Sequence, residues 1–250
     1  MISIEKFLKN GYQKLKFSDK TIIDRFQKKI KKKINIRLKK LNKTVKDLEK
    51  FYELKLNDKE KSFVFDANYR NIEIGKNEIK ELYKSNYLKA IIEHYYGNKK
   101  TYILYLVKNK FKTNLSGFRV VQPYSSKVAN VHSESSYGQH CFTIWIPIIG
   151  FSKNSTLRIF PKSHIYRHDD KSIIKNRKLN KAQLFKKNYV NKFKKTKRLN
   201  FNKGEFLVFH PDLLHGGSLN KSSKARVSME MRIYQDNKVS YKPTKRALKK

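Results

Sequence analysis

The spacing of apolar residues predicts helices in the first hundred residues. After Ser18, which can cap a helix, apolar side chains recur every three or four positions as far as Leu41. A second stretch of the same kind covers residues 77–96, and Gly97 follows it, as a glycine commonly follows the end of a helix. We therefore expect residues 1–100 to form a mainly helical N-terminal region.

After residue 100 the pattern changes to that of β-strands. Short runs rich in β-branched and aromatic residues follow one another, and turn-forming residues separate most of them. These runs are TYILYLV, FRVVQ, FTIWIPI, TLRIF, EFLVFH and RVSMEMRIY. Because no helical pattern lies between most of them, a parallel βαβ sheet is disfavoured, and residues 101–236 are expected to form an antiparallel sandwich or barrel.

A basic segment interrupts this β-rich region. Residues 171–200 carry 12 Lys or Arg residues and no Asp or Glu. Two interpretations stay open for this insertion: a flap whose charge recruits an anionic substrate, or a solvated surface loop. Residues 237–250 form a basic tail.

Composition narrows the classes of protein to which the chain can belong. Lys and Arg number 59 against 20 Asp and Glu, which gives a formal net charge of +39, but only 11 of the basic residues are Arg. Arg is the residue that recognises phosphates and bases in a bidentate manner. The charge therefore indicates non-specific electrostatic binding of polyanions rather than a dedicated nucleic-acid-binding protein.

Other features bear on compartment and covalent chemistry. No run of about 18 apolar residues predicts a membrane span, and the N-terminus lacks the apolar core of a secretory signal. Cys141 is the single cysteine, which excludes an intramolecular disulfide and a cysteine-rich zinc site. We therefore expect a cytoplasmic protein without a membrane partner. Nothing in the sequence indicates an oligomeric state.

Candidate metal ligands occur in two places. His132 and Glu134 are two positions apart, so in a strand both side chains point to one face and form a two-ligand clamp. His215 follows a buried strand and stands beside two glycines, which let the backbone bend and let another group approach closely. Two histidines and one carboxylate with open coordination positions form the facial triad of non-haem Fe(II) oxygenases.

A candidate anchor for a carboxylate follows the third ligand. Arg226 and Ser228 open the last apolar strand, eleven residues beyond His215, and share one strand face. A guanidinium beside a hydroxyl suits a carboxylate, which accepts a bidentate pair and one further hydrogen bond. A 2-oxoacid cosubstrate needs such an anchor.

Together these motifs resemble the phytanoyl-CoA-dioxygenase-like family of Fe(II)/2-oxoglutarate-dependent oxygenases. The resemblance covers about residues 118–234 and rests on the order and spacing of the motifs. They are the H-x-E pair, FTIWIPI, TLRIFPKSH and GEFLVFHPDLLHGGSLNKSSKARVSMEMRIY, with His215 and Arg226 at the family's usual separation.

The resemblance implies a mainly β fold, a double-stranded β-helix (jelly-roll or cupin-like) core with N-terminal helices packed on it. It implies that Fe(II) is bound by His132, Glu134 and His215. It further implies that Arg226 binds the distal carboxylate of the cosubstrate 2-oxoglutarate, assisted by Ser228 or Ser218.

One ligand departs from the family's usual pattern, because the family more often has Asp where this chain has Glu134. Glutamate is one methylene longer but still supplies a carboxylate oxygen. Halogenating relatives lack this carboxylate, so its presence argues for hydroxylation. His164, in PKSH, and His210 are interpreted as structural residues. Thr143 shares a strand face with Trp145, which leaves two options open for it: a core residue or one that lines the pocket.

We therefore expect an Fe(II)/2-oxoglutarate-dependent dioxygenase that uses O2 to hydroxylate a small metabolite: a sugar, an acyl thioester or an amino-acid derivative. Both an anionic and a neutral substrate stay open. The segments RVVQP, WIPI and PKSH also resemble a branch found in bacterial carbohydrate-biosynthesis clusters. The alternative is a non-catalytic, basic polyanion-binding protein built on an oxygenase scaffold. The complete triad and Arg226 count against it.

Overall fold

The computed structural model describes most of the chain and all three candidate metal ligands. It describes residues 3–66, 70–97, 101–104, 115–124, 131–134, 141–166, 174–176, 184–185, 190, 193, 196–216 and 220–235. Ser218, which the sequence analysis places at the cosubstrate, lies outside the described residues, as does the tail at 237–250.

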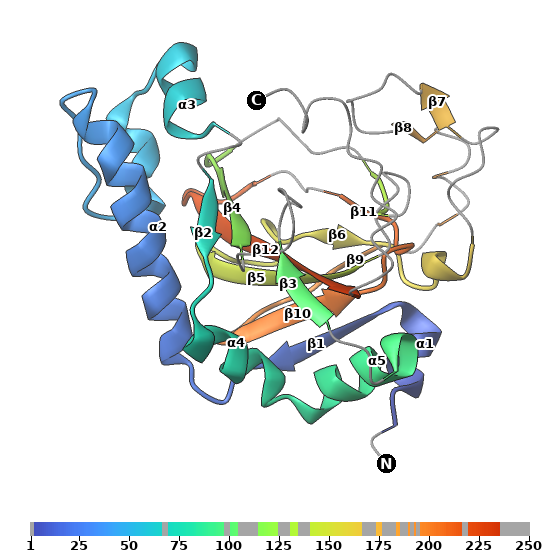
Figure 1. Ribbon diagram of the computed structural model, residues 1–250. Helices are drawn as coiled ribbons and strands as arrows, with labels where there is room; N and C mark the ends of the chain where they lie inside the picture. Colours follow the sequence, from blue (N-terminus) through green and yellow to red (C-terminus); the bar gives the residue numbers. More distant parts are fainter. Residues whose placement is uncertain are drawn as a thin grey trace.

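Helices occupy most of the described residues before residue 97. They are α1 (Glu5–Asn10), α2 (Thr21–Lys39), η1 (Leu48–Leu54), α3 (Asp58–Val64), α4 (Lys76–Tyr83) and α5 (Asn86–Tyr96), and η3 (Ser163–Ile165) follows later in the chain. In Figure 1, α1, α4 and α5 lie beneath the large sheet and α2 runs along its side. Over the described ranges, the helices are too short or too polar to cross a lipid bilayer.

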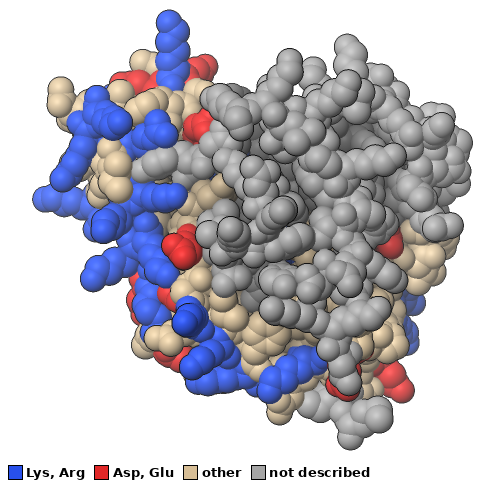
Figure 2. All heavy atoms as spheres, viewed as in Figure 1, with Lys and Arg blue, Asp and Glu red and all other residues tan. Residues whose placement is uncertain are grey.

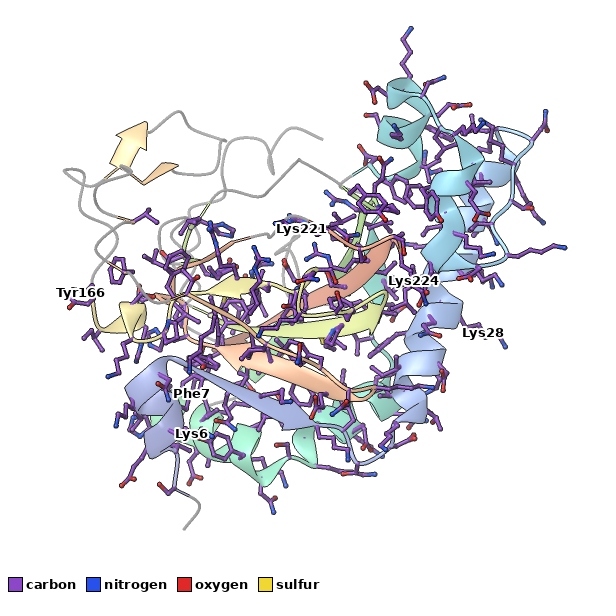
Figure 3. The ribbon with its side chains drawn as sticks, turned by 180° about the vertical axis from the view of Figure 1, so that it is seen from behind. Lys6, Phe7, Lys28, Tyr166, Lys221 and Lys224 are labelled. Carbon is purple, nitrogen blue, oxygen red and sulfur yellow. The ribbon has the colours of Figure 1, made fainter. Side chains whose placement is uncertain are left out.

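Helix α2 forms where the apolar spacing predicts a helix. One stripe of its surface is buried in the main core and consists of Ile22, Ile23, Phe26, Ile30, Ile34 and Leu38. Lys28 instead projects from α2 away from the sheets (Figure 3). Because each fully buried aliphatic or aromatic side chain contributes roughly 1.5–3 kcal/mol, this stripe holds a Lys-rich helix in place.

The second predicted helix, at residues 77–96, is two helices. α4 ends at Tyr83, and the Ser85 side chain begins α5 by accepting a hydrogen bond from the Leu88 N–H at 3.2 Å. A serine that binds a nearby backbone N–H favours a helix start over a helix interior. The apolar spacing continues across this break and therefore did not reveal it.

The strands form two main antiparallel sheets. The large sheet has the order β1-β10-β5-β12-β4-β2, with β3 also paired to β12, and the small sheet has the order β11-β6-β9. Strands β7 and β8 pair separately. The strands are β1 (Tyr12–Lys16), β2 (Asn71–Glu73), β3 (Thr101–Leu104), β4 (Leu115–Val121), β5 (Phe142–Ile149), β6 (Arg158–Ile159), β7 (Ile174–Asn176), β8 (Leu184–Phe185), β9 (Lys197–Arg198), β10 (Glu205–Phe209), β11 (His215–Gly216) and β12 (Arg226–Gln235).

Apolar side chains fill the spaces on both faces of the large sheet. Strand β5 is buried on both faces, which explains its nearly continuous apolar sequence. On one face Phe142, Ile144 and Ile146 join the core between the large sheet and the helices. On the other, Trp145 packs in a cluster that joins the two sheets, together with Leu157, Ile159, Leu207, Phe209 and Leu213. A site between the sheets is therefore enclosed by rigid strands.

The N-terminal region is not helical throughout, because it also supplies the two end strands in the order of the large sheet. Strand β1 pairs with β10, and β2 pairs with β4. Both strands are short, and Lys14 and Lys16 lie in β1. Lysine on edge strands is a common device against unwanted pairing, and it leaves little of the apolar alternation that identifies a strand. The division of the chain at residue 100 stays a prediction.

Much of the basic insertion at residues 171–200 lies outside the described residues. Its described parts include β7, β8 and β9, and β9 pairs with β6 of the small sheet. Phe193 and Val190 pack beside Phe160, Leu214 and Val131 in a small apolar cluster. This cluster anchors the segment next to the strands that carry the candidate ligands. Whether the insertion is a substrate flap stays an open prediction.

A glycine directly after β5 lies close to the residue that precedes β12. Gly150 has a φ of +69°, and a Cβ added there would lie 1.9 Å from the Ala225 carbonyl oxygen, directly before Arg226. We expect Gly150→Ala to destabilise the protein by about 2–4 kcal/mol, through backbone strain and the clash together. Chemical denaturation measures this free energy of unfolding.

Gly97 offers a matched control, because its φ is +60° but an added Cβ would meet nothing within 4 Å. Gly97→Ala should cost only the backbone strain, about 1–3 kcal/mol for a residue at φ +60° and ψ −150°. Equal destabilisation by the two substitutions would contradict the close approach of β5 to β12.

Candidate metal centre

Backbone pairing brings the two candidate histidines together. The His132 N–H donates to the His215 carbonyl and the His215 N–H donates to the His132 carbonyl, both at 2.9 Å. Residues paired in this way across antiparallel strands carry their side chains on the same face. The two imidazole rings accordingly lie with their centroids 4.4 Å apart. The main chain therefore sets the distance between the two rings.

Glu134 completes a group of three potential ligands. One ligand atom each from His132, Glu134 and His215 lies within 4.8 Å of the others. Glu134 is 2% exposed and His215 is 3% exposed, whereas His132 is half-buried. The structure thus brings together the three residues that the spacing nominated as ligands. Their role as metal ligands stays a prediction.

The His215 ring is oriented by a backbone carbonyl. Its Nδ1 lies 2.9 Å from the Leu213 carbonyl oxygen, and because a carbonyl only accepts, Nδ1 carries the proton. Nε2 is then left with a free lone pair and faces Glu134 Oε1 at 3.6 Å. Burial, reinforced by the nearby His132, lowers the pKa of His215 to about 4. The ring is therefore neutral near pH 7, as a metal ligand must be.

The PKSH segment supports the strand that carries His215. The Leu214 N–H donates to Ser163 Oγ at 2.8 Å, and the Phe160 N–H donates to the Leu214 carbonyl at 3.0 Å. Next to Ser163, His164 Nε2 lies 2.7 Å from the Leu8 carbonyl oxygen of α1. His164 therefore ties the N-terminal helix to this segment, in agreement with its structural interpretation.

His210 also has a packing role. Its ring contacts those of Tyr95, Phe142 and His164, with centroids 5.4–5.8 Å apart. It directly follows β10, and of the rings that it contacts, Phe142 belongs to the main core and Tyr95 packs against it. The interpretation of His210 as a packing residue agrees with these contacts.

Arg232 is a residue of the site that the sequence analysis missed. Its Nε donates to Glu134 Oε2 at 3.0 Å, and its Nη2 lies 2.8 Å from Oε2 and 3.0 Å from Oε1. Burial alone would raise the pKa of Glu134, but Arg232 and the two imidazoles outweigh it and lower that pKa. A signal was present in RVSMEMR, where polar residues occupy every second position and so share the face of Arg226.

Arg226 is a buried cation without a carboxylate partner among the described residues. It is 3% exposed, its Nη1 donates to the Ser155 carbonyl at 3.1 Å, and its Nε has no hydrogen-bond partner. Burial, reinforced by the positive charge of Arg119, lowers its pKa to about 10. Ser228, on the same strand face, is 2% exposed. A guanidinium in this state fits an anionic ligand that supplies the missing acceptor.

Thr143 has a second orphaned polar atom on this inner face. Its hydroxyl is buried without a hydrogen-bond partner, and its strand register places it beside Arg232 on β12 and Phe209 on β10. Thr143 therefore lies on the face of β5 that also carries Trp145, and its role as a pocket-lining residue stays a prediction. The donor set as a whole fits Fe(II), which two imidazoles and one carboxylate bind while leaving positions open.

The chain matches one protein family along most of its length. The sequence profile described as phytanoyl-CoA dioxygenase (PhyH) matches residues 8–228. The match begins in α1 and so includes the N-terminal helices as well as the β-rich region. No curated protein sequence matches the chain.

Several solved structures have a similar fold. EctD from S. alaskensis, solved with 2-oxoglutarate and 5-hydroxyectoine, has a TM-score of 0.58 at 13% identity, covering 94% of this chain and 76% of that chain. The epimerase SnoN, in complex with Fe3+, alpha ketoglutarate and nogalamycin RO, has a TM-score of 0.57 at 10% identity, covering 96% and 84%. The Ni complex of the non-heme monooxygenase ThoJ has a TM-score of 0.53 at 10% identity, covering 92% and 76%. The predicted fold, a jelly-roll core with N-terminal helices, is confirmed.

The geometry of the three residues generates a prediction on metal affinity. We expect His215→Ala to weaken binding of Fe(II) or Co(II) by more than about 100-fold, because changes to residues behind the ligands already cost about 10–100-fold. Isothermal titration of the metal-free protein measures the dissociation constant. His94→Ala, at an exposed histidine of α5, is the matched control and should bind metal like the wild type.

Proposed function

The chain belongs to the phytanoyl-CoA dioxygenase family of Fe(II)- and 2-oxoglutarate-dependent oxygenases, and we propose that it hydroxylates a small anionic metabolite at a centre formed by His132, Glu134 and His215. The observation that carries this proposal is the convergence of three ligand atoms within 4.8 Å, on the inner side of a jelly roll that also buries an unpaired arginine. EctD and SnoN, which share the fold, were solved with 2-oxoglutarate or alpha ketoglutarate.

Each residue has a defined task in this proposal. Bound Fe(II) and 2-oxoglutarate supply the oxidative chemistry, in which 2-oxoglutarate is decarboxylated to succinate as O2 oxidises the substrate. His132, Glu134 and His215 hold the metal from one side. The Leu213 carbonyl fixes the ring of His215, so that Nε2 faces the metal position.

Arg226 and Ser228 hold the cosubstrate in the proposal. The distal carboxylate of 2-oxoglutarate fits the Arg226 guanidinium, whose Nε lacks a partner, and the Ser228 hydroxyl lies on the same strand face. A carboxylate there removes the cost of a buried, half-satisfied guanidinium. Ser218 keeps its place in the proposal as a further contact.

The anionic character of the substrate is supported by a second arginine close to Arg226. Arg119 on β4 lies opposite Ser228 on β12, so their side chains share a face. Arg119 is exposed, forms no ion pair with the described residues and is close enough to Arg226 to lower the pKa of that residue. One carboxylate of the cosubstrate compensates one positive charge, whereas Arg119 and Arg226 together supply two. The remaining charge suits an anionic substrate.

The polyanion-binding alternative finds its support on another face. Lys and Arg side chains gather over α2 in Figure 2, far along the surface from the strands that carry the ligands. These side chains are mostly Lys, which bind polyanions as point charges without geometric selectivity. A non-catalytic protein would not require the converging ligands and the buried Arg226, so the oxygenase is the function that the site supports best.

The central test is turnover of the cosubstrate. With Fe(II), O2 and 2-oxoglutarate, the protein should form succinate, slowly without substrate and faster with it. Arg226→Ala should raise the Michaelis constant for 2-oxoglutarate at least about 30-fold, since loss of one partner of a buried charge pair typically costs about 2–5 kcal/mol. The affinity for Fe(II) should change little.

Arg25→Ala is the control for this substitution, because Arg25 is an exposed arginine of α2 paired with Asp19 at 3.1 Å. Its Michaelis constant for 2-oxoglutarate should equal that of the wild type. Absence of succinate under all conditions would refute the oxygenase proposal, and an unchanged Michaelis constant in Arg226→Ala would refute the role of Arg226.

Substrate charge is tested with a panel of compounds. We expect sugar phosphates, nucleotide-linked sugars or acyl thioesters to stimulate succinate formation, and neutral sugars to fail. Arg119→Gln should raise the Michaelis constant of the productive compound several-fold and flatten its dependence on salt, because salt screens such a charge over about 10 Å at 0.1 M. Lys28→Gln, on the outer face of α2, should change neither quantity. Stimulation by neutral compounds alone would contradict an anionic substrate.

A further inference from the structure

We propose that Arg232 is a positioning residue that makes Glu134 bind the metal through one oxygen. The inference rests on the proposed role of Glu134 as a metal ligand and concerns how that ligand is held. In the proposal, Arg232 holds Oε2 of Glu134 with two hydrogen bonds. The other oxygen, Oε1, lies nearer to His215 and binds the metal.

The two oxygens of Glu134 have different surroundings. Oε2 receives hydrogen bonds from both Nε and Nη2 of Arg232, at 3.0 Å and 2.8 Å. Oε1 receives one, from Nη2 at 3.0 Å, and lies 3.6 Å from His215 Nε2. Oε1 is therefore the oxygen on the histidine side, whereas Oε2 is directed at the guanidinium.

The position of Arg232 is fixed by the strands around it. Strand β12 lies between β5 and β4 in the large sheet and also pairs with β3, and Arg232 stands opposite Thr143 of β5 and Leu104 of β3. Arg232 is 9% exposed, and Nη2 also lies 3.9 Å from Glu230 Oε2. A buried bidentate pair is costly to break, because each partner would remain charged without compensation.

Glutamate needs such an anchor more than aspartate does. Its terminal torsion has a broad energy profile, so the carboxylate of a free glutamate rotates easily. A carboxylate that turns both oxygens to a metal takes two of six octahedral positions. With two histidines, that leaves two positions, whereas one-oxygen binding leaves three, the number that the open facial triad requires. Anchoring Oε2 therefore keeps open the coordination position that the second oxygen of a freely rotating glutamate carboxylate would take.

The test reads carboxylate binding directly in the metal-loaded protein without turnover. Co(II) is added to metal-free protein labelled with 13C at the glutamate carboxylates, and infrared difference spectra are recorded. A carboxylate bound through one oxygen shows a wider separation of its asymmetric and symmetric stretching bands than one bound through two. We expect the wide separation in the wild type and a narrower one in Arg232→Lys, which keeps the charge but loses the forked geometry.

The affinity for Co(II) provides a second, independent readout. Arg232→Gln should weaken Co(II) binding by about 10–100-fold in the protein with Glu134, as changes to residues that orient ligands typically do. In a Glu134→Asp background, the shorter carboxylate does not reach the fork of Arg232, so the same substitution should cost less than about threefold. A general loss of stability would weaken both backgrounds equally.

Arg25→Lys is the control, because it makes the same exchange of arginine for lysine at a residue of α2 that pairs with Asp19 instead of a candidate ligand. It should leave both the infrared bands and the Co(II) affinity unchanged. A narrow band separation in the wild type would overturn the inference even if no Arg232 variant folds. Equal losses in the two backgrounds would also overturn it. If His215→Ala instead bound Co(II) as tightly as the wild type, that result would refute the proposed metal centre.

Discussion

The two reciprocal hydrogen bonds between His132 and His215 are the interaction on which the rest of the site depends. They fix two imidazoles side by side through the main chain, with both N···O distances at 2.9 Å. A separation set by backbone pairing does not depend on long, flexible side chains. It does depend on β11, a strand of two residues that cannot hold its place alone. The small sheet supplies that support, because β6 pairs with β11 and Ser163 accepts the Leu214 N–H.

Burial of charge is the second constraint. Two of the buried charged side chains, Arg226 and Arg232, lie on the inner face of β12. Polar residues alternate there with the apolar Val227, Met229 and Met231, which point into the main core. Arg232 is compensated by Glu134 within the chain, whereas among the described residues Arg226 has the carbonyl of Ser155 as its hydrogen-bond partner. Within the described part of the chain, Arg226 is therefore a buried cation without a carboxylate partner. In the proposed function, a ligand that supplies a carboxylate should therefore bind with that group at the Arg226 end of the face, because the other described arginine of this face on β12, Arg232, is already paired with Glu134.

Features that depend on a local period could be predicted from the sequence. Features whose interaction partners lie on strands distant in the sequence could not. The stripe of α2, the apolar run of β5 and the clamp at His132 and Glu134 all follow from periods of 3.6 or 2 residues. The pair of Glu134 and Arg232 joins residues 98 positions apart, so no local pattern contains it. Strands β1 and β2 were missed for a different reason. They are short, and the two Lys of β1 weaken its apolar alternation, so pairing to the sheet rather than propensity makes them strands.

The N-terminal helix takes part in the same network as the metal centre. His164 contacts the Leu8 carbonyl of α1, and its neighbour Ser163 holds the residue before His215. Gly11 lets this contact form, because an added Cβ would lie 2.5 Å from His164 Nδ1 and its φ is +79°. Two consecutive residues of PKSH therefore connect α1 to the strand of a candidate ligand. The N-terminal helix is therefore joined to the strand of His215 by two short hydrogen bonds through neighbouring residues, so α1 belongs to the framework around the candidate site together with the strands.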